Sequence, residues 1–347
     1  MRHLSFRSTT CLMLPAVLLV HLVTAASAPA RTWRVPTDAP TVGAGIDSAS
    51  AGDVVEVACG EYTVPPLYLK SGITLRSESG DPACVTLRST GSPGPVLRFD
   101  ELTDISVEGL TLTGVNNTGG VGGGAFGYRS TFSIIDCVIR DNLTSTGGGI
   151  ELRQCTDVYI TGCLFRGNHA QADGGALVLR NTTATVTGCT FSNNLAVSLG
   201  GAIYNAESFT IYRNCTVTGN EVDPANAAFY VTRYPVPVID RSIIAHNIGG
   251  AGLKCWPTGT VPSVQCSNIF GNPGGDWIAC LTSLEGMNGN ISEDPQFCSS
   301  TPDLDERWTL QSDSPCVPVD YGDCPLMGAW PVGCQTTATE NRTWGQV

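Results

Sequence analysis

The sequence has little positive charge. Lysine occurs only as Lys70 and Lys254 among 347 residues, and the formal net charge is -12 at pH 7. A protein that binds nucleic acid needs a basic surface that releases counterions from the phosphates, so we expect no nucleic-acid partner. Histidine is also scarce, with four residues, and no CxxC motif occurs. These absences argue against a zinc site, and we expect no cofactor.

Long apolar runs are missing after the first 30 residues. The chain starts with basic residues, continues with an apolar run from Leu12 to Val23 and then has the small residues TAASAPA. This order is typical of a secretory signal peptide, predicted at residues 1–30. Pro15 and His21 interrupt the run, which is shorter than the ~20 residues that cross a bilayer. We therefore predict a secreted, periplasmic or cell-surface protein with no transmembrane segment after signal removal.

Cysteine, in contrast, is frequent, with 15 residues. Four cysteines recur with a 26-residue period, in segments such as CTFSNNLAVSLGGAIYN (189–205), and asparagines and glycines keep the same step. Counting back by one step adds Asn116 and Gly122. A fixed period of this size is typical of a solenoid. The periodic residues are Cys137, Cys163, Cys189, Cys215, Asn142, Asn168, Asn194, Asn220, Gly148, Gly174 and Gly200.

The repeated segments are rich in β-forming residues and show no helical period. If each segment stacks on its copy one repeat later, neighbouring strands are parallel and about 4.8 Å apart, which describes a parallel β-helix. We expect the periodic cysteines, Ile139, Phe165, Phe191 and Val217 to form columns inside it. The asparagines are expected at a turn, where each amide bonds the next and where asparagine tolerates a left-handed backbone. Glycines would supply φ > 0 at the corners.

Both ends of such a solenoid need a cover. We predict a short amphipathic helix at residues 41–50 and a final apolar strand at residues 325–330. Cys59 and Cys84 would bridge two neighbouring coils, and we expect a monomer. The predicted division is a signal peptide at 1–30, a β-helix domain at 31–334 with an N-terminal cap at 31–60, regular coils at 61–250 and Cys-rich closing coils at 251–334, and a disordered tail at 335–347.

Several segments carry a family resemblance. AGDVVEVACGEYTVPPLYLKSGITLRSESG (51–80) resembles the opening of secreted right-handed parallel β-helix proteins of the pectin-lyase-like superfamily, and GNISEDPQF (289–297) and WTLQSDSPC (308–316) resemble their closing coils. The pairs FRGN…GGAL and FSNN…GGAI resemble repeats of polymorphic outer-membrane proteins. The resemblance implies an all-β fold, a single-stranded right-handed parallel β-helix with coils of the period described above. It leaves the function open, because this superfamily includes lyases, hydrolases, epimerases and non-enzymes.

An enzyme of this kind needs converging carboxylates for acid–base chemistry or Ca²⁺ binding. The regular repeats contain no acids one coil apart, but Glu78 and Asp104 have a 26-residue separation and Asp81 and Glu108 a 27-residue separation. If the first coils keep the same step, these acids meet at one edge, with Lys70 or Arg98 as a base beside a bound cation. The candidate catalytic residues are therefore Glu78, Asp104 and Lys70, and the candidate metal ligands Glu78, Asp81, Asp104 and Glu108. The alternative is that all are solvated loop charges.

Two pairs of arginines also follow the period. Arg140 and Arg166 are separated by a 26-residue step, and Arg153 and Arg180 by a 27-residue step. Stacked like charges repel unless an anion or a neighbouring acid offsets them, so these four are the candidate ligand-binding residues for an acidic sugar. The alternative is an ordinary exposed face. An exposed aromatic row would favour sugar stacking, with the candidates Tyr128, Tyr159, Tyr204 and Tyr212.

Three functions fit these observations. The first is a non-enzymatic secreted or cell-surface protein that binds a polysaccharide or cell-surface glycan through its elongated flank. The second is a polysaccharide lyase or epimerase that acts on acidic polysaccharide, and only this alternative would involve Ca²⁺. The third is a structural envelope component. The scarcity of clustered acids with a basic partner favours the first.

Overall fold

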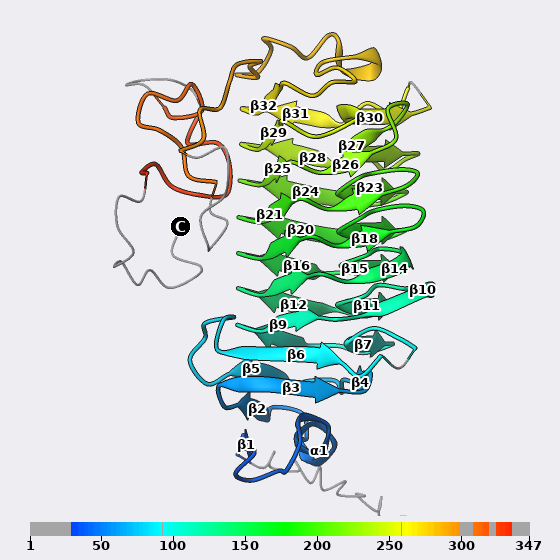
Figure 1. The fold of residues 1–347 in the computed structure, drawn as a ribbon, viewed down its shortest axis with the longest axis vertical. Helices are drawn as coiled ribbons and strands as arrows, with labels where there is room; N and C mark the ends of the chain where they lie inside the picture. The colour runs from blue at the N-terminus through cyan, green and yellow to red at the C-terminus, as the bar shows by residue number, and fades with distance from the viewer. Residues whose placement is uncertain (1–28, 92, 258, 299–307, 319–323, 335–347) are drawn as a thin grey trace, which may run out of the picture.

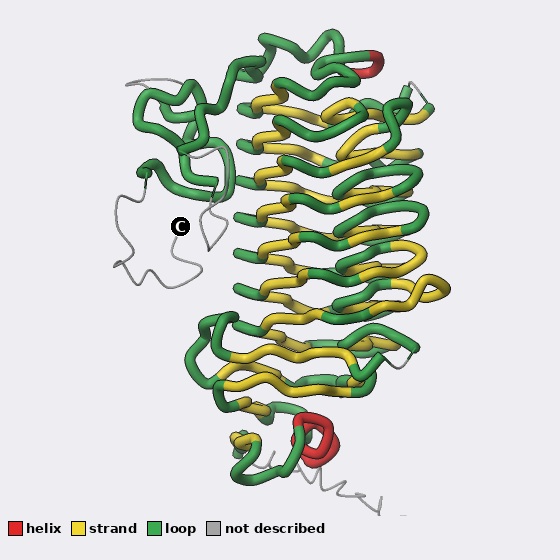
Figure 2. The backbone as a smooth tube through the Cα atoms, in the orientation of Figure 1, coloured by secondary structure: helices red, strands yellow, loops and turns green. Residues whose placement is uncertain are grey.

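The computed structural model describes residues 29–91, 93–257, 259–298, 308–318 and 324–334. The predicted signal peptide, except for its last two residues, and the predicted tail lie outside the described residues. Within the described part, the chain winds into a column of stacked coils (Figures 1 and 2). The strands of its four sheets pair in parallel. The predicted parallel β-helix is thus confirmed.

Two sheets extend along most of the column. Sheet A contains β1 (Thr32–Val35), β2 (Val54–Val57), β5 (Thr74–Ser77), β8 (Ile105–Glu108), β12 (Phe132–Ile135), β16 (Val158–Thr161), β20 (Thr183–Thr187), β24 (Phe209–Arg213), β28 (Val238–Asp240) and β31 (Ser263–Gln265). Sheet B contains β3 (Gly60–Val64), β6 (Val85–Ser89), β9 (Thr111–Thr113), β13 (Val138–Arg140), β17 (Leu164–Arg166), β21 (Thr190–Ser192), β25 (Thr216–Thr218), β29 (Ile243–Ala245) and β32 (Asn268–Phe270).

Two further sheets complete each regular coil in the order A, B, D, C. Sheet D contains β10 (Asn116–Val121), β14 (Leu143–Thr146), β18 (His169–Ala170), β22 (Leu195–Ala196) and β26 (Glu221–Val222). Sheet C contains β4 (Leu67–Tyr68), β7 (Leu97–Asp100), β11 (Ala125–Tyr128), β15 (Ile150–Arg153), β19 (Leu177–Arg180), β23 (Ile203–Ala206), β27 (Ala227–Thr232) and β30 (Ala251–Trp256).

The step between stacked residues is regular only in part of the column. Val158 lies beside Ala184, which is the predicted 26-residue step. Near the N-terminus, however, Val54 pairs with Thr74 and Thr74 with Ser106, which are a 20-residue step and a 32-residue step. Loops of different length between the first strands cause this variation. The first coils therefore do not keep the 26-residue step.

The predicted interior columns are present. The periodic cysteines are at most 2% exposed, and Ile139, Phe165, Phe191 and Val217 are also buried. The rings of Phe165 and Phe191 stack with their centroids 4.7 Å apart. Because parallel strands in register place equal residues above one another, the repeat becomes a set of vertical apolar files inside the column.

A ladder of buried asparagines stands at the corner between sheets B and D. The Nδ2 of Asn168 donates to Oδ1 of Asn194 at 3.0 Å, and the Nδ2 of Asn194 donates to Oδ1 of Asn220 at 2.9 Å. The same bonds continue beyond the predicted series to Asn247 and Asn272. The ladder satisfies polar groups that are removed from water.

The predicted start of this ladder at Asn116 is wrong. Asn116 is exposed in β10 and pairs with Leu143. Val115 takes the corresponding place, and its backbone N–H donates to Oδ1 of Asn142 at 3.1 Å. The coil below Asn142 is one residue longer at this corner than the 26-residue step assumes.

The left-handed residue at this corner is the one before each ladder asparagine. Asp141 and Asn193 have φ of 54° and 53°, and Gly167 and Gly219 have 59° and 64°. The ladder asparagines therefore serve as hydrogen-bonding groups, while their neighbours make the bend.

A second corner, between sheets D and C, is formed by glycines. Gly122, Gly147, Gly174 and Gly200 have φ between 59° and 65°. In one coil the left-handed glycine is thus one residue earlier than the predicted Gly148. A Cβ at any of these four positions would also lie within 2.7 Å of another atom. The positive φ and this lack of space explain why the corner requires glycine.

The N-terminal end is covered by helix α1 (Val42–Ser48), in the region where a helix was predicted. Thr41 caps it, because its Oγ1 accepts a hydrogen bond from the backbone N–H of Ala44 at 3.1 Å. Val42 and Ile46 are buried. The apolar side of the helix therefore closes the open end of the core.

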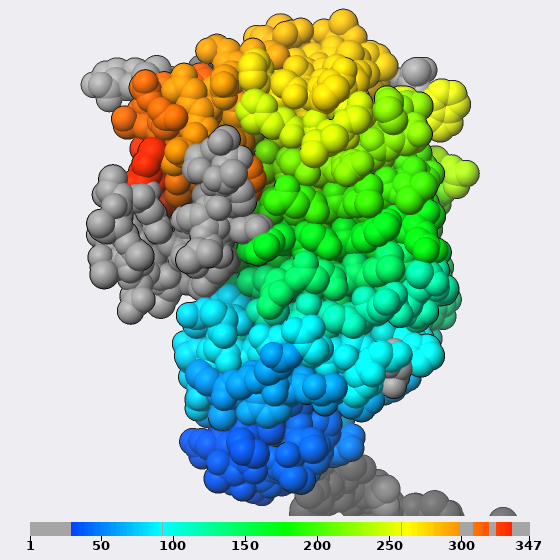
Figure 3. Space-filling view, in the orientation of Figure 1, coloured from blue at the N-terminus to red at the C-terminus, as the bar shows by residue number. Residues whose placement is uncertain are grey.

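The C-terminal segment does not continue the coils. After β32 the chain forms the 3₁₀ turn η1 (Ala279–Leu281) and then returns along the side of the column, as the orange and red part of Figures 1 and 3 shows. We call residues 308–318 and 324–334 the C-terminal strap. The segment 325–330, predicted as a final strand, forms no strand.

The strap bonds to three successive coils, at sheet B or just before it. The N–H of Gly328 donates to the carbonyl of Arg241 at 2.9 Å. The N–H of Ala329 donates to Oγ1 of Thr216 at 3.0 Å, and the indole N–H of Trp330 donates to Oγ1 of Thr190 at 2.9 Å. The outward Thr190 and Thr216 are consequently buried. The strap is thus a lateral cover rather than a terminal plug.

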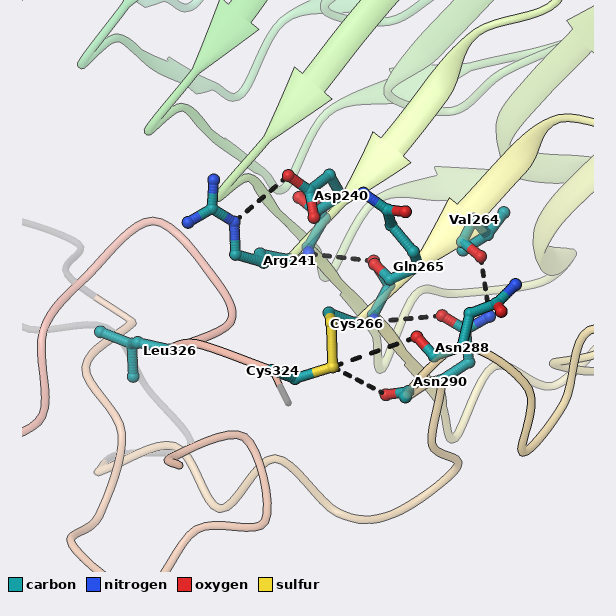
Figure 4. Close-up of a disulfide and its surroundings, with 12 residues drawn as sticks. Asp240, Arg241, Val264, Gln265, Cys266, Asn288, Asn290, Cys324 and Leu326 are labelled. Atoms are coloured by element: carbon teal, nitrogen blue, oxygen red, sulfur yellow. Dashed lines mark hydrogen bonds and ion pairs between the residues drawn. A yellow bond between two sulfur atoms is a disulfide. The ribbon is translucent and has the colours of Figure 1, made fainter. Parts of the chain in front are cut away.

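Disulfides connect neighbouring coils and hold the strap. The predicted Cys59–Cys84 bridge is confirmed. Figure 4 shows Cys266, which follows β31, bonded to Cys324 of the strap. The backbone N–H of Cys266 also donates to the carbonyl of Asn288 at 2.9 Å. The two other bridges of the described residues are Cys255–Cys280 and Cys298–Cys334.

Among the described residues, neither helical segment has the length and apolar character needed to traverse a bilayer.

Candidate functional site

The outer face of sheet C carries two vertical files of side chains. The first file is buried under the corner between sheets D and C, and the second file, two residues further along each strand, is more exposed. The strand register places successive members one coil apart. The first file includes Phe126, Glu151, Val178, Tyr204 and Tyr230, and the second includes Tyr128, Arg153, Arg180, Ala206, Thr232 and Trp256.

Two arginines of the second file share one buried carboxylate. Arg153 and Arg180 pair directly in register, so their Cα atoms are about 4.8 Å apart. Glu151 is fully buried, and its Oε1 lies 2.7 Å from Arg153 and 3.5 Å from Arg180. The other carboxylate oxygen of Glu151 accepts a hydrogen bond from the hydroxyl of Thr146. The acid therefore offsets the repulsion between the two guanidinium groups and fixes their direction.

Both arginines remain partly accessible. The side chain of Arg153 is 41% exposed and that of Arg180 is 31% exposed. Asp173, at the corner between sheets D and C, lies 3.3 Å from Arg180. Arg180 also lies over the ring of Tyr204, at 4.9 Å from its centroid. Two positive groups are thus held in place and presented to solvent with unused N–H donors.

Aromatic rings continue this face toward the C-terminal end. The centroids of Tyr204 and Tyr230 are 6.3 Å apart. Trp256 at the end of β30 is 61% exposed. Arg233 forms an ion pair with Glu207 on the rim. Tyr204 and Tyr230 are buried beneath this face, so Trp256 and the partly exposed Tyr128 are the rings accessible to a ligand. An accessible ring beside polar donors is a feature of saccharide sites, because the face of a sugar ring packs on an aromatic ring.

Two hollows lie along this face and share Arg180 and Asn181 in their linings. One has a volume of about 420 Å³ and the other about 660 Å³, in the range of ligand sites. We call them together the sheet C groove. Its lining consists of Tyr128, Thr146, Arg153, Gln154, Arg180, Asn181, Leu199, Tyr204, Ala206, Glu207, Tyr230, Thr232, Arg233, Trp256 and Pro257.

The acids in and beside the groove are engaged by arginines. Glu151, Asp173 and Glu207 each form an ion pair with an arginine. Burial, with a smaller contribution from Tyr204, raises the pKa of Tyr230. A general base must be free to accept a proton, whereas each of the three carboxylates is held by an arginine.

The structure separates the two predicted arginine pairs. Arg153 and Arg180 lie in the sheet C groove, as described above. Arg140 and Arg166 also pair in register, but on sheet B, on the side of the column that carries the strap. Arg140 forms an ion pair with Asp141 at 2.7 Å. The four arginines therefore do not form one stripe.

The structure does not bring the predicted acids together. Glu78 follows β5, where its carboxylate accepts the N–H of Cys59 at 2.8 Å. Asp104 precedes β8, which pairs Ser106 with Thr74, so these two acids lie at opposite ends of neighbouring strands. The 32-residue step between β5 and β8 explains why the 26-residue separation of the two acids does not stack them.

The remaining predicted site residues have local partners. Asp81 accepts the N–H of Ala83 at 2.9 Å in a turn, and Glu108 accepts the hydroxyl of Ser106 at 2.6 Å. Lys70 donates to the carbonyls of Asp47 and Ala49 at the end of α1. Lys70 thus caps the C-terminus of a helix. Its ammonium group is held there rather than beside the acids with which it was predicted to form a site.

One group of potential metal ligands has a different explanation. The ligand atoms of Cys59, Glu78 and Cys84 lie within 4.8 Å of one another. The two cysteines, however, form a disulfide, so they supply no thiolate for a metal.

The aromatic candidates also divide. Tyr128 and Tyr204 line the sheet C groove. Tyr159 is 50% exposed on sheet A, whereas Tyr212 is 1% exposed inside the column. The four tyrosines therefore do not form one row, and the groove also contains Tyr230 and Trp256.

Sequence reasoning missed Glu151, Asp173 and Trp256. No acid lies one 26-residue step from Glu151, so the period did not point to it. The signal was local: Glu151 and Arg153 are two residues apart on one strand, and their side chains therefore share a face. Arg180 then comes to the same acid through the 27-residue step between β15 and β19. Asp173 reaches Arg180 from a corner, which strand alternation does not predict.

Comparisons with known proteins identify the family. A family model described as a right handed beta helix region matches residues 111–288. Similar solved structures are a pectate lyase, Pel9A (TM-score 0.49, 11% identity, 88% of this chain and 97% of the other), and a deglycosylated pectin methylesterase from Aspergillus niger (0.42, 13%, 78% and 92%). A third is the A-module of the mannuronan C-5 epimerase AlgE6 from Azotobacter vinelandii (0.39, 16%, 67% and 72%). A search of curated proteins found no match.

Proposed function

The chain belongs to the right-handed β-helix family, and from this premise we propose that it binds an acidic polysaccharide in the sheet C groove without cleaving it. The disulfides between its coils suit an oxidising compartment, and we place the protein outside the cytoplasm, in the secreted fraction or at the cell surface. A solenoid is well suited to this task, because its long flat flank can follow an extended chain.

The observation that carries the proposal is that two arginines form ion pairs with one buried carboxylate. Arg153 and Arg180 are one coil apart, and Glu151 holds both. Each planar guanidinium has five N–H donors, and a carboxylate ligand accepts two of them side by side. An acidic polysaccharide presents such carboxylates at regular intervals, so the two arginines would contact successive anionic groups.

The rings around these arginines support the same ligand class. Tyr128 lies one coil below Arg153, while Trp256 lies further toward the C-terminal end of the groove. A bound chain would place its apolar ring faces on these side chains and its carboxylates on the arginines. The groove thus combines the two kinds of contact that distinguish an acidic sugar from a simple anion.

Binding is favoured over lyase or epimerase chemistry because the acids of the groove are engaged by arginines and the pKa of Tyr230 is raised. A reaction that removes a proton next to a carboxylate requires a free base positioned at that carbon. The groove offers firm electrostatic contacts instead.

The test is titration of the purified protein with polygalacturonate and alginate, and with dextran as a neutral polymer, by calorimetry at several salt concentrations. We expect binding of an acidic polymer that weakens with salt. Arg153→Gln and Arg180→Gln should each lower the affinity by about 10- to 100-fold, since a hydrogen bond to a charged group contributes about 1.5–3 kcal/mol. Arg140→Gln is the matched control and should bind like the wild type.

Two outcomes would replace this proposal. Equal binding by the wild type and by Arg153→Gln would show that the groove is not the site, and no binding of any acidic polymer would favour the structural envelope role. Product formation is measured in parallel as the ultraviolet absorbance of unsaturated sugar, with and without Ca²⁺. An increase would establish a lyase.

A further inference from the structure

Sheet A carries another hollow on a different side of the column. Its volume is about 570 Å³, and its lining is rich in hydroxyl groups and contains two acids and one tyrosine. We call it the sheet A hollow. It is lined by Thr74, Thr103, Asp104, Ile105, Ser106, Thr131, Phe132, Ser133, Asp157 and Tyr159.

The strand register explains why these residues meet. Ser106 lies beside Ser133, and Ser133 lies beside Tyr159, so the three form one outward file. Asp104 and Asp157 directly precede β8 and β16, two residues before Ser106 and Tyr159. Thr131 holds the same place in the coil between them. The two acids are two coils apart, about 10 Å by the spacing of parallel strands. The hollow therefore has a hydroxyl-bearing floor with an acid near each end.

Tyr159 supplies an apolar surface at one end of this floor. Its side chain is 50% exposed, although its neighbours Val158 and Ile160 are buried in the core. An exposed ring on a flat sheet, beside Thr185 of the next coil, is accessible from the side. Such a ring offers the face on which a sugar ring packs.

Hydrogen bonds hold the backbones of the two acids, while their carboxylates can accept hydrogen bonds from a ligand. Asp104 and Asp157 have φ of 57° and 49°. Their N–H groups donate to Oγ1 of Thr131 at 3.2 Å and of Thr183 at 3.4 Å. Among the described residues, no lysine, arginine or histidine forms an ion pair with either carboxylate. This distinguishes them from the acids of the sheet C groove.

We propose that the sheet A hollow binds a neutral saccharide unit, with Tyr159 as the stacking platform and Asp104 and Asp157 as hydrogen-bond acceptors. Ionised carboxylates only accept hydrogen bonds, and sugar hydroxyls donate them. The Ser106 hydroxyl donates to Glu108 and can only accept from a ligand, whereas the other serine and threonine hydroxyls of the lining can act in either direction. A uronate would bring a third negative charge toward two carboxylates that no arginine offsets, so the hollow selects against it.

This site is independent of the proposed function of the sheet C groove. The hollow faces outward from sheet A, and no residue lines both the hollow and the groove. The protein would therefore hold two sugars of different charge, either two parts of one mixed polymer or two separate chains. Loss of binding at one site leaves the other unchanged.

The experiment is ligand-observed NMR titration with neutral disaccharides, namely mannobiose, cellobiose and galactobiose, and with digalacturonate as the acidic probe. We expect at least one neutral disaccharide to bind the wild type and to bind Tyr159→Ala about tenfold more weakly, which corresponds to the energy of one ring contact. Tyr159→Phe keeps the ring and should bind like the wild type. Tyr68→Ala, which removes another exposed tyrosine, is the matched control.

Asp157→Asn tests the acceptor role without disturbing the turn, because asparagine tolerates a left-handed backbone. We expect weaker binding of the neutral disaccharide together with a smaller preference over digalacturonate. The Arg153→Gln variant should retain neutral binding, which separates this proposal from that of the groove. The proposal is overturned if no neutral disaccharide binds, if Tyr159→Ala binds like the wild type, or if binding occurs only with added Ca²⁺.

Discussion

Replacement of one asparagine inside the ladder should be among the most destabilising single changes in this protein. The side chain of Asn194 makes four hydrogen bonds. Its Nδ2 donates to the carbonyl of Phe165 at 3.0 Å and to Oδ1 of Asn220 at 2.9 Å. Its Oδ1 accepts from the backbone N–H and from the Nδ2 of Asn168, both at 3.0 Å. Alanine can replace none of these bonds.

The magnitude follows from these bonds. A buried hydrogen bond contributes about 1 kcal/mol net, and a buried group left without a partner costs about 1–3 kcal/mol. The N–H of Asn168 loses its acceptor, whereas Oδ1 of Asn220 still accepts the backbone N–H of Asn194 at 3.0 Å. We therefore expect Asn194→Ala to lower the free energy of unfolding by about 3–5 kcal/mol, which is a large part of the stability of an ordinary domain.

The assay is equilibrium unfolding in urea followed by circular dichroism. The matched control is Asn116→Ala, because Asn116 keeps the 26-residue step but lies exposed outside the ladder. We expect the control to change the free energy of unfolding by less than about 0.5 kcal/mol. A loss below about 1 kcal/mol for Asn194→Ala, or equal effects of the two variants, would refute the reasoning.

Three further predictions concern other parts of the column. Gly174→Ala should be more destabilising than Gly188→Ala, since the two glycines have similar φ of 63° and 61° but only at Gly174 would a Cβ come within 2.3 Å of another atom; thermal unfolding of the two variants measures the difference, and equal effects would contradict it. Burial raises the pKa of Cys215 to about 12, so this thiol should resist a thiol reagent at neutral pH until urea unfolds the protein, and fast labelling of the native protein would contradict this. Burial, and to a smaller extent a neighbouring acid, raises the pKa of Asp136. Because the pKa of Asp136 is higher in the folded than in the unfolded protein, its ionisation lowers the free energy of unfolding as the pH rises from the unfolded to the folded pKa. Asp136→Asn should therefore stabilise the protein at neutral pH and lose this advantage in acid. Urea unfolding at several pH values measures this, and a gain independent of pH would contradict the raised pKa.

The interior of this fold was predictable because it repeats. Phe165 and Phe191 are separated by one step, and any stacking of like segments places them in contact, as the ring distance of 4.7 Å confirms. The same reasoning found the cysteine column, and a 25-residue separation close to the period suggested the Cys59–Cys84 bridge. In each case one local fact, the period, determined a contact between residues that are distant in the sequence.

Features that do not repeat could not be predicted in this way. The distance between Glu78 and Asp104 depends on loops that lengthen one coil to a 32-residue step, and no periodic signal reports a loop length. The strap is a second example, because Trp330 contacts Thr190, which is distant in the sequence, without any matching pattern. The first error arose where a sequence period was extended into coils that do not share it, and the second where no period exists.

The outward files show why candidate sites are found where the repetition is broken. An inward position must be apolar or, like Asn205, fully buried with hydrogen-bond partners, since a single charge there would be buried without a partner. An outward position has no such constraint. In the first file of sheet C, three successive coils carry Glu151, Val178 and Tyr204. That acid is fully buried, and Arg153 and Arg180 offset its charge. A buried ionic group of this kind is weak evidence for stability, so we relate the presence of Glu151 in this file to the proposed role of the two arginines that it holds.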